Sequence, residues 1–213
     1  ALLTLAPLAL LLAACQSRRD PDRLIVATRN RIDTVDPAAA STIGAMQLLS
    51  AIGDPLYAVR SDGSIEPRLA SAMPRTSADG LRVVVPLRQG VRFHDGTRFD
   101  AAAMVFSLQR FLAIGTLSYL LGDRVVGVRA LDAHTVELRL RKPFAAMPQL
   151  LSAINLTPLS PTAYRRYSRR QLSDRFVGTG PYRLSVYTPQ QQRLVPFQQY
   201  WGRPPAKIGR AHV

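Results

Sequence analysis

The middle of the sequence contains two segments in which apolar and polar residues alternate. In residues 135–141 one face of a strand would carry Val136, Leu138 and Leu140, and the other Glu137, Arg139 and Arg141. Residues 81–88 form a second extended segment, and Pro86 within it favours an edge position because proline has no amide hydrogen to donate to a neighbouring strand. We therefore predict a small antiparallel sheet that buries one face.

Turn and helix signals surround these strands. Three Asp-Gly pairs, Asp62-Gly63, Asp79-Gly80 and Asp95-Gly96, predict tight turns because glycine adopts positive φ without a steric penalty. Asp100 can cap a helix whose apolar residues lie mostly on one side: Met104, Phe106, Leu108, Phe111 and Leu112. A helix over a half-buried sheet predicts an α/β, mixed α+β unit.

Further elements are expected on both sides of this unit. Residues 24–27 predict a buried strand, and residues 46–52 have helical spacing. After Pro143 come an apolar helical run to Ile154 and a basic helix. Residues 182–187 and 193–197 predict a final hairpin.

The first residues indicate export. Residues 1–14 are apolar apart from Thr4, a run too short to span a bilayer but typical of the core of a signal peptide. Leu12-Ala13-Ala14-Cys15 follows in the pattern of a lipoprotein processing site, so we predict that Cys15 becomes the lipidated N-terminus, followed by a tether over residues 15–23. The alternative is an ordinary signal peptide that ends at a free cysteine.

The cysteine content and the net charge bear on how the protein is stabilised and on which partners it binds. Cys15 is the sole cysteine, so an exported domain of this size must be stabilised by its apolar core and not by disulfides. The formal net charge of +14 would suit a nucleic-acid partner, but the arginines are spread over the chain. The densest group lies at residues 165–170, and we interpret it as a solvated helix face because an exported protein meets little nucleic acid.

We find no candidate catalytic set. His94, His134 and His212 have no metal-ligand spacing, and the sequence contains no nucleophile elbow, zinc-protease motif or phosphate-binding loop. The sequence therefore predicts neither an enzyme nor a cofactor or metal site.

An ordered set of short motifs resembles one family. Its pieces are Asp62-Gly63-Ser64-Ile65-Glu66-Pro67-Arg68-Leu69-Ala70, Leu87-Arg88-Gln89-Gly90-Val91-Arg92-Phe93-His94-Asp95-Gly96-Thr97, Val105-Phe106-Ser107-Leu108, Leu140-Arg141-Lys142-Pro143-Phe144, Val177-Gly178-Thr179-Gly180-Pro181-Tyr182 and Tyr200-Trp201-Gly202. Together they resemble the peptide/nickel/opine type of bacterial extracellular solute-binding protein, family 5. The resemblance runs from about residue 24 to residue 207.

The resemblance implies a type II periplasmic binding protein-like fold of which this chain carries the N-terminal part, without the second lobe. It places residues 24–57 and 178–206 in a partial first subdomain and residues 58–177 in a second subdomain. Gly178 and Gly180 would form the hinge between them. Residues 207–213 resemble a translated sequencing adapter, and we expect them to be a non-native tail.

The resemblance also implies a function and a site. The protein would be a periplasmic, lipid-anchored and monomeric receptor of an ABC importer that captures a peptide or related small solute and delivers it to the permease. The residues that would line the ligand cleft are Ser41, Thr42, Ile43, Tyr119 and Asn155. Two other readings stay open: a cytoplasmic transcriptional regulator with a solute-binding-like domain, and an exported hydrolase.

The lipid anchor leads to a first prediction. Because Cys15 is the sole possible lipid acceptor, the Cys15→Ser variant, expressed with a complete signal peptide, should move from the membrane pellet to the soluble extract. The measurement is immunoblotting of fractions washed in high salt. Retention of the variant in the washed pellet would show that Cys15 is not the anchor.

Overall fold

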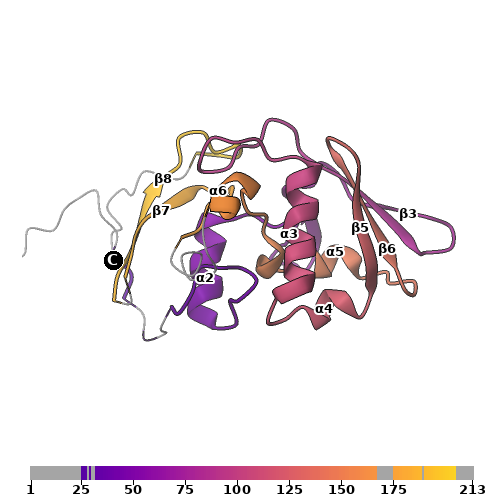
Figure 1. Ribbon diagram of the computed structural model, residues 1–213, viewed down its shortest axis with the longest axis horizontal. Coiled ribbons are helices and arrows are strands. Elements are labelled where there is room, and N and C mark those ends of the chain that lie inside the picture. Colours follow the sequence, from indigo (N-terminus) through magenta and orange to yellow (C-terminus); the bar gives the residue numbers. More distant parts are fainter. Residues whose placement is uncertain (1–24, 28, 30–31, 167–174, 189, 205–213) are drawn as a thin grey trace, which may run out of the picture. The chain divides into compact units, whose positions relative to one another are not determined.

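The computed structural model describes residues 25–27, 29, 32–166, 175–188 and 190–204. Figure 1 shows its ribbon. The chain divides into two units, Thr28–Pro205 and a unit that combines Ala1–Ala27 with Ala206–Val213. The predicted signal peptide, Cys15 and the predicted tail lie outside the described residues.

The predicted strand at residues 24–27 is not found. Of its four residues three are described, and they form no strand, with Ile25 74% and Val26 77% exposed. A strand needs a neighbour that satisfies its backbone amides and carbonyls, and none of the described strands pairs with this segment. The prediction of a buried strand is therefore wrong for these residues.

The alternating segments form a four-stranded antiparallel sheet in the order β3-β4-β6-β5. Its strands are β3 (Arg75–Thr76), β4 (Arg82–Pro86), β5 (Val125–Asp132) and β6 (Thr135–Leu140). Val83, Val136 and Leu138 are buried on one face, whereas Arg82 and Arg139 are exposed on the other. The predicted sheet with one buried face is confirmed.

Pro86 does not mark an edge strand, so that prediction is wrong. The strand β4 lies between β3 and β6. The pairing of β3 reaches Val83 and Val84, so Pro86 lies beyond the end of this short neighbour. Its missing amide hydrogen is tolerated there because β3 offers it no partner.

The three Asp-Gly pairs form the predicted turns. Gly63, Gly80 and Gly96 have φ of 82°, 71° and 82°. In each turn the aspartate side chain accepts a hydrogen bond from the backbone amide two residues later, at 2.9 to 3.0 Å. The first turn joins β1 (Tyr57–Val59) to β2 (Ile65–Pro67), and the second joins β3 to β4.

The helix α3 (Ala101–Ile114) separates two apolar cores. Asp100 caps it as predicted, since its Oδ1 accepts a hydrogen bond from the Ala103 amide at 2.8 Å. Met104, Leu108 and Phe111 face the sheet, whereas Phe106 packs on the opposite side. Figure 1 shows α3 between the sheet and α2.

The sheet core is the larger cluster. Its largest fully buried side chains are Tyr57, Phe93, Phe99, Leu56, Leu69, Met104, Leu108, Leu121, Leu138 and Met147. It is closed by α4 (Tyr119–Gly122), α5 (Met147–Leu150) and the 3-10 helix η1 (Ile154–Leu156). The predicted long helical run after Pro143 is therefore split into two short helices.

The α2 core lies on the other side of α3. It consists of Val35, Ala40, Ala45, Leu48, Leu49, Ile52, Leu159, Ala163, Tyr164 and Phe176. These residues come mainly from α2 (Ile43–Ile52) and α6 (Pro161–Arg166), and the predicted hairpin, β7 (Tyr182–Tyr187) with β8 (Gln192–Pro196), packs against them. Both proposed subdomains contribute to this core, and their boundaries stay a prediction.

The fold class is mixed α/β, as predicted from the sequence. Within the described ranges every helix is too short or too polar to cross a bilayer.

The cap of α3 can be tested directly. Replacing Asp100 by Ala leaves the Ala103 amide without its acceptor, so we expect the free energy of unfolding to fall by about 1 kcal/mol. Urea denaturation followed by circular dichroism measures this. Asp100→Asn keeps an acceptor oxygen and should retain most of the stability, and an equal loss in both variants would contradict a capping role.

Candidate functional site

The segment from Thr34 to Thr42, here called the wall loop, has a tightly bonded backbone. The Asp36 carbonyl accepts hydrogen bonds from the amides of Ala39 and Ala40 at 3.0 and 2.9 Å. The Asp36 side chain accepts another from the Ala38 amide at 3.0 Å. The loop therefore contains a turn that is held by hydrogen bonds within the loop itself.

Two distant segments hold the outer carbonyl groups of the wall loop. The Asn155 side-chain nitrogen donates to the carbonyls of Pro37 and Ala40 at 3.0 and 2.7 Å. The Thr116 amide, in the turn between α3 and α4, donates to the Ala38 carbonyl at 2.8 Å. Because these bonds leave few backbone groups unpaired, the loop has one preferred conformation.

A nearly buried ion pair fixes the loop to α3. Both terminal guanidinium nitrogens of Arg110 bond the Asp36 carboxylate, at 2.7 and 2.5 Å, and the Arg110 side chain is only 12% exposed. The guanidinium also lies 5.1 Å from the centre of the Tyr164 ring. Burial alone would lower the pKa of Arg110, but the hydrogen bonds and charge of Asp36 raise it, so the guanidinium stays charged.

Two apolar side chains outside this rigid loop, at the starts of α2 and α4, are exposed to solvent. Ile43, which begins α2, is 68% exposed, and Tyr119, which begins α4 three residues after Thr116, is 57% exposed. Ser41 is also exposed. Exposed apolar groups on a fixed backbone are the kind of surface that a ligand can cover without a large ordering cost.

Four of the five predicted ligand residues belong to the wall loop, follow it or bond it, and they differ in accessibility. Thr42 is half-buried, and its hydroxyl accepts a hydrogen bond from the Ala45 amide at 3.3 Å and donates one to Asp33 at 3.3 Å. Asn155 is 7% exposed and lies beneath the loop. Ser41, Ile43 and Tyr119 are the accessible members.

Gly178 and Gly180 lie at the opposite end of α2. The Gly180 amide donates to the Ile52 carbonyl at 3.1 Å. A Cβ atom on Gly180 would lie 2.4 Å from the Ile52 carbonyl carbon, and one on Gly178 would lie 2.8 Å from the Ile52 oxygen. Neither glycine has positive φ, so close backbone approach requires them here, and their role as a hinge stays a prediction.

His94 binds this glycine segment. Its Nε2 lies 3.0 Å from the Gly180 carbonyl oxygen, and its amide donates to the Gly178 carbonyl at 2.8 Å. The ring packs edge-on against Phe197, with the centroids 5.0 Å apart. Burial lowers the pKa of His94 to about 4, because protonation would place a second N–H on the buried Nδ1, which has no partner among the described residues.

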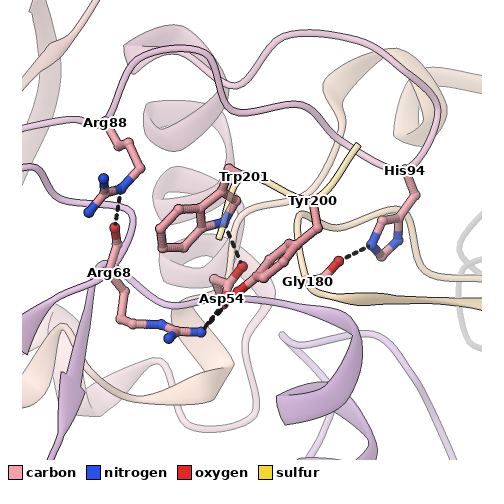
Figure 2. Close-up of polar contacts among 7 residues, drawn as sticks. All are labelled: Asp54, Arg68, Arg88, His94, Gly180, Tyr200 and Trp201. Atoms are coloured by element: carbon pink, nitrogen blue, oxygen red, sulfur yellow. Dashed lines mark hydrogen bonds and ion pairs between the residues drawn. The ribbon is translucent and has the colours of Figure 1, made fainter. Parts of the chain in front are cut away.

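A buried carboxylate joins several of the sequence motifs. Figure 2 shows Asp54, 1% exposed, between Arg68, Tyr200 and Trp201. It accepts hydrogen bonds from Arg68 at 2.6 Å, from the Trp201 indole at 3.0 Å and from the Tyr200 hydroxyl at 3.3 Å. Burial raises the pKa of Asp54 above its ordinary value, and the three donors, which stabilise the carboxylate, limit this rise.

Arginine stacking completes this network. The Arg88 guanidinium lies 4.5 Å from the centre of the Trp201 ring, and its Nε donates to the Arg68 carbonyl at 2.9 Å. Sequence reasoning did not find the network. The signal was present, since Arg68, Arg88 and the Tyr200-Trp201 pair all belong to the motifs of the family resemblance, but a motif does not show which carboxylate its residues surround.

Two surface depressions were found, and none of the predicted ligand residues lines either of them. One, of about 370 Å³, lies beside the Asp54 network, and the other, of about 440 Å³, lies along β7. Among the described residues no group of three or more His, Cys, Asp or Glu side chains could hold a metal ion.

Residues 64–213 match the family described as bacterial extracellular solute-binding proteins, family 5 Middle. This match covers more than half of the chain. The chain belongs to this family.

Curated relatives in the family include the glutathione-binding protein GsiB of Escherichia coli O1:K1 / APEC. It is 29% identical over 181 residues, which are 84% of this chain and 35% of GsiB. The chain thus spans about a third of the length of the curated relatives that it matches.

Solved structures show the same fold. Listeria monocytogenes OppA bound to peptide superposes with a TM-score of 0.78 at 21% identity, covering 86% of this chain and 40% of OppA. NikZ from Campylobacter jejuni in complex with Ni(L-His) superposes with a TM-score of 0.75 at 24% identity, covering 86% and 37%. The predicted type II periplasmic binding protein-like fold is confirmed, and the chain carries part of it.

His94 makes the stability of the folded chain depend on pH. Its pKa of about 4 in the folded chain lies below the ordinary 6.5, so the unfolded chain binds more protons between these values. Neutral His94 therefore contributes up to about 3 kcal/mol to the free energy of unfolding. This contribution is fully present above about pH 6.5 and is lost as the pH falls toward about 4.

The variant His94→Gln isolates this contribution, because glutamine can donate to the Gly180 carbonyl but does not titrate. Urea unfolding of both proteins over this pH range measures the effect. The wild type should lose more stability than the variant, and parallel stability curves would show that His94 contributes nothing to the pH dependence.

Proposed function

We propose that the protein is the solute-binding component of an ABC importer, which captures a peptide or related small solute outside the cytoplasmic membrane and delivers it to the permease. Family membership carries this proposal, because the family consists of extracellular solute-binding proteins. A binding role also needs no nucleophile or catalytic base.

The wall loop is the proposed ligand contact on this part of the protein. Ile43 and Tyr119 would cover apolar parts of the solute, and Ser41 would offer its hydroxyl group at the N-terminus of α2. Thr42, whose hydroxyl bonds Asp33 and Ala45, would hold this end of α2 beside the solute. Asn155 would act from below, by holding the Pro37 and Ala40 carbonyls. The Asp36–Arg110 pair would keep the loop in place when the solute leaves, so that little conformational entropy is lost at each binding event.

The relatives support the proposed solute class. GsiB is a glutathione-binding protein, OppA is bound to peptide, and NikZ is bound to Ni(L-His). These ligands share amino-acid groups. A surface that combines the wall-loop hydroxyls with an aliphatic side chain, Ile43, and an aromatic one, Tyr119, suits such solutes.

The remaining proposals concern domains and location. Residues 24–57 with 178–206, and residues 58–177, would be subdomains of a two-lobed receptor that closes around its solute, with Gly178 and Gly180 at the crossing. Closure requires that the solute binds the closed state more tightly than the open one. The receptor would be monomeric, lie in the periplasm and be anchored by a lipid on Cys15.

The proposal is tested with the full-length protein and a solute panel of short peptides, glutathione and nickel–histidine. A thermal-shift screen should identify a stabilising solute, because a ligand that binds only the folded state raises its melting temperature. Absence of any shift across the panel would contradict the proposed solute class.

The wall loop is then tested by calorimetry with the solute found. Ile43→Asp should weaken binding about tenfold or more, because it places a charge where the solute covers an aliphatic group, while the melting temperature without solute stays unchanged. Val59, another exposed aliphatic residue, is 58% exposed on β1 and provides the matched control Val59→Asp. Equal effects of both substitutions would remove the wall loop from the ligand site.

A further inference from the structure

The face of the four-stranded sheet that turns away from α3 is rich in arginine. Cross-strand pairing places Arg75, Val84, Glu137 and Arg129 in one row, and Arg82, Arg139 and Gly127 in the next. Arg141, exposed directly after β6, follows the same alternation. Figure 1 shows α3 on the other side of the sheet, and no described helix covers this outer sheet face.

Positive charge dominates the outer sheet face. Its five arginines stand against one carboxylate, Glu137, which is 3% exposed. Arg129 and Arg139 bond Glu137 at 2.8 and 3.4 Å, yet their own side chains remain 57% and 59% exposed. The buried carboxylate is thus bonded by two guanidinium groups, and the side chains that carry them remain largely exposed.

The acidic residues nearest to this face are occupied in its turns. Asp79 accepts a hydrogen bond from the Leu81 amide at 3.0 Å, and Asp132 accepts one from the His134 amide at 2.7 Å. Both lie at the ends of hairpins and not within the two rows. They reduce the excess of positive charge at the rim but leave the centre of the face basic.

The edge strand β5 adds apolar groups beside these charges. Its pairing with β6 is irregular between Val125 and Gly127 and between Ala130 and Asp132. The two residues at these irregularities, Val126 and Leu131, are 55% and 44% exposed. Such bulges protect an edge strand from pairing with other chains, and here they also place an aliphatic side chain on each side of Arg129.

We propose that the outer sheet face rests on an anionic phospholipid surface. Guanidinium groups form paired hydrogen bonds with phosphate, and aliphatic side chains next to basic ones are typical of surfaces that lie at lipid headgroups. The charges spread over a sheet face that coincides with neither surface depression, which suits a membrane better than a small anion. The proposal goes beyond solute binding and shares with it only the location outside the cytoplasm.

The experiment uses the full-length protein expressed without residues 1–15, so that neither the apolar run nor a lipid on Cys15 binds membranes. Cosedimentation with vesicles of phosphatidylcholine alone is compared with vesicles in which a third of the lipid is phosphatidylglycerol. We expect binding to the anionic vesicles that weakens steeply with salt. Each neutralised arginine should reduce the partition coefficient about fivefold.

The test variant is Arg75→Gln with Arg82→Gln, since neither side chain bonds Glu137 in the structure. The matched control is Arg183→Gln with Arg193→Gln, which removes the same charge from the exposed positions of β7 and β8. The test variant should bind about 25-fold more weakly and the control should be unaffected. Both should keep their solute affinity, so a failure of this proposal is separate from a failure of the proposed function.

Three results would overturn the proposal. The first is no preference for anionic vesicles, and the second is an equal loss of vesicle binding in the two variants. The third is that the protein binds no vesicles at all, while the test variant binds the purified importer more weakly than the wild type. The last result would identify an acidic protein surface as the partner. Val126→Ser with Leu131→Ser tests the aliphatic contribution, and we expect a further loss of binding that salt does not reproduce.

Discussion

The buried carboxylate of Asp54 is the interaction on which most of this structure depends. A carboxylate at 1% exposure is unfavourable unless donors surround it, and the three donors come from two separate places in the chain: Arg68 after β2, and Tyr200 and Trp201 after β8. Because Asp54 itself follows α2, its hydrogen bonds tie the end of that helix to both segments. Arg88, stacked on Trp201, adds the end of β4.

The backbone after α2 also packs closely against the segment that leads into β7. Gly178 and Gly180 lie against the last residues of α2, and the Gly180 carbonyl accepts the hydrogen bond of His94. The turn at Asp95-Gly96 is thereby fixed against the segment that leads into β7. One carboxylate, two glycines and one histidine thus help to hold the hairpin β7–β8 against α2 and the Asp95-Gly96 turn.

At the other end of α2 a buried carboxylate, Asp36, also fixes a segment, and here the fixed segment is the wall loop. Polar groups of the wall loop are bonded by Asp36, Arg110 and Asn155. Ile43, which directly follows the loop, is not needed to hold it and remains exposed. A loop that needed Ile43 for its own packing could not offer it to a ligand. Buried polar contacts therefore give the loop its rigidity, and the apolar residues at its end remain available for recognition.

The sequence by itself determined the local structure and the family. Alternation predicted β6 and its exposed face, Asp-Gly pairs predicted three turns, Asp100 predicted the start of α3, and the ordered motifs predicted the family that the comparison found. Each of these depends on residues close together in the chain, where helix and strand periodicity and turn geometry apply directly. The predicted ligand residues came from the family resemblance alone.

Tertiary structure decided what depends on distant partners. Asp36 and Arg110 are 74 residues apart, Asp54 and Trp201 are 147 apart, and no local rule indicates that they meet. The strand predicted at residues 24–27 failed because a strand exists only with a neighbour, and Pro86 lies inside the sheet because β3 is too short to reach it. Buried charges and sheet order are set by which segments pack together, and that is a property of the folded chain as a whole.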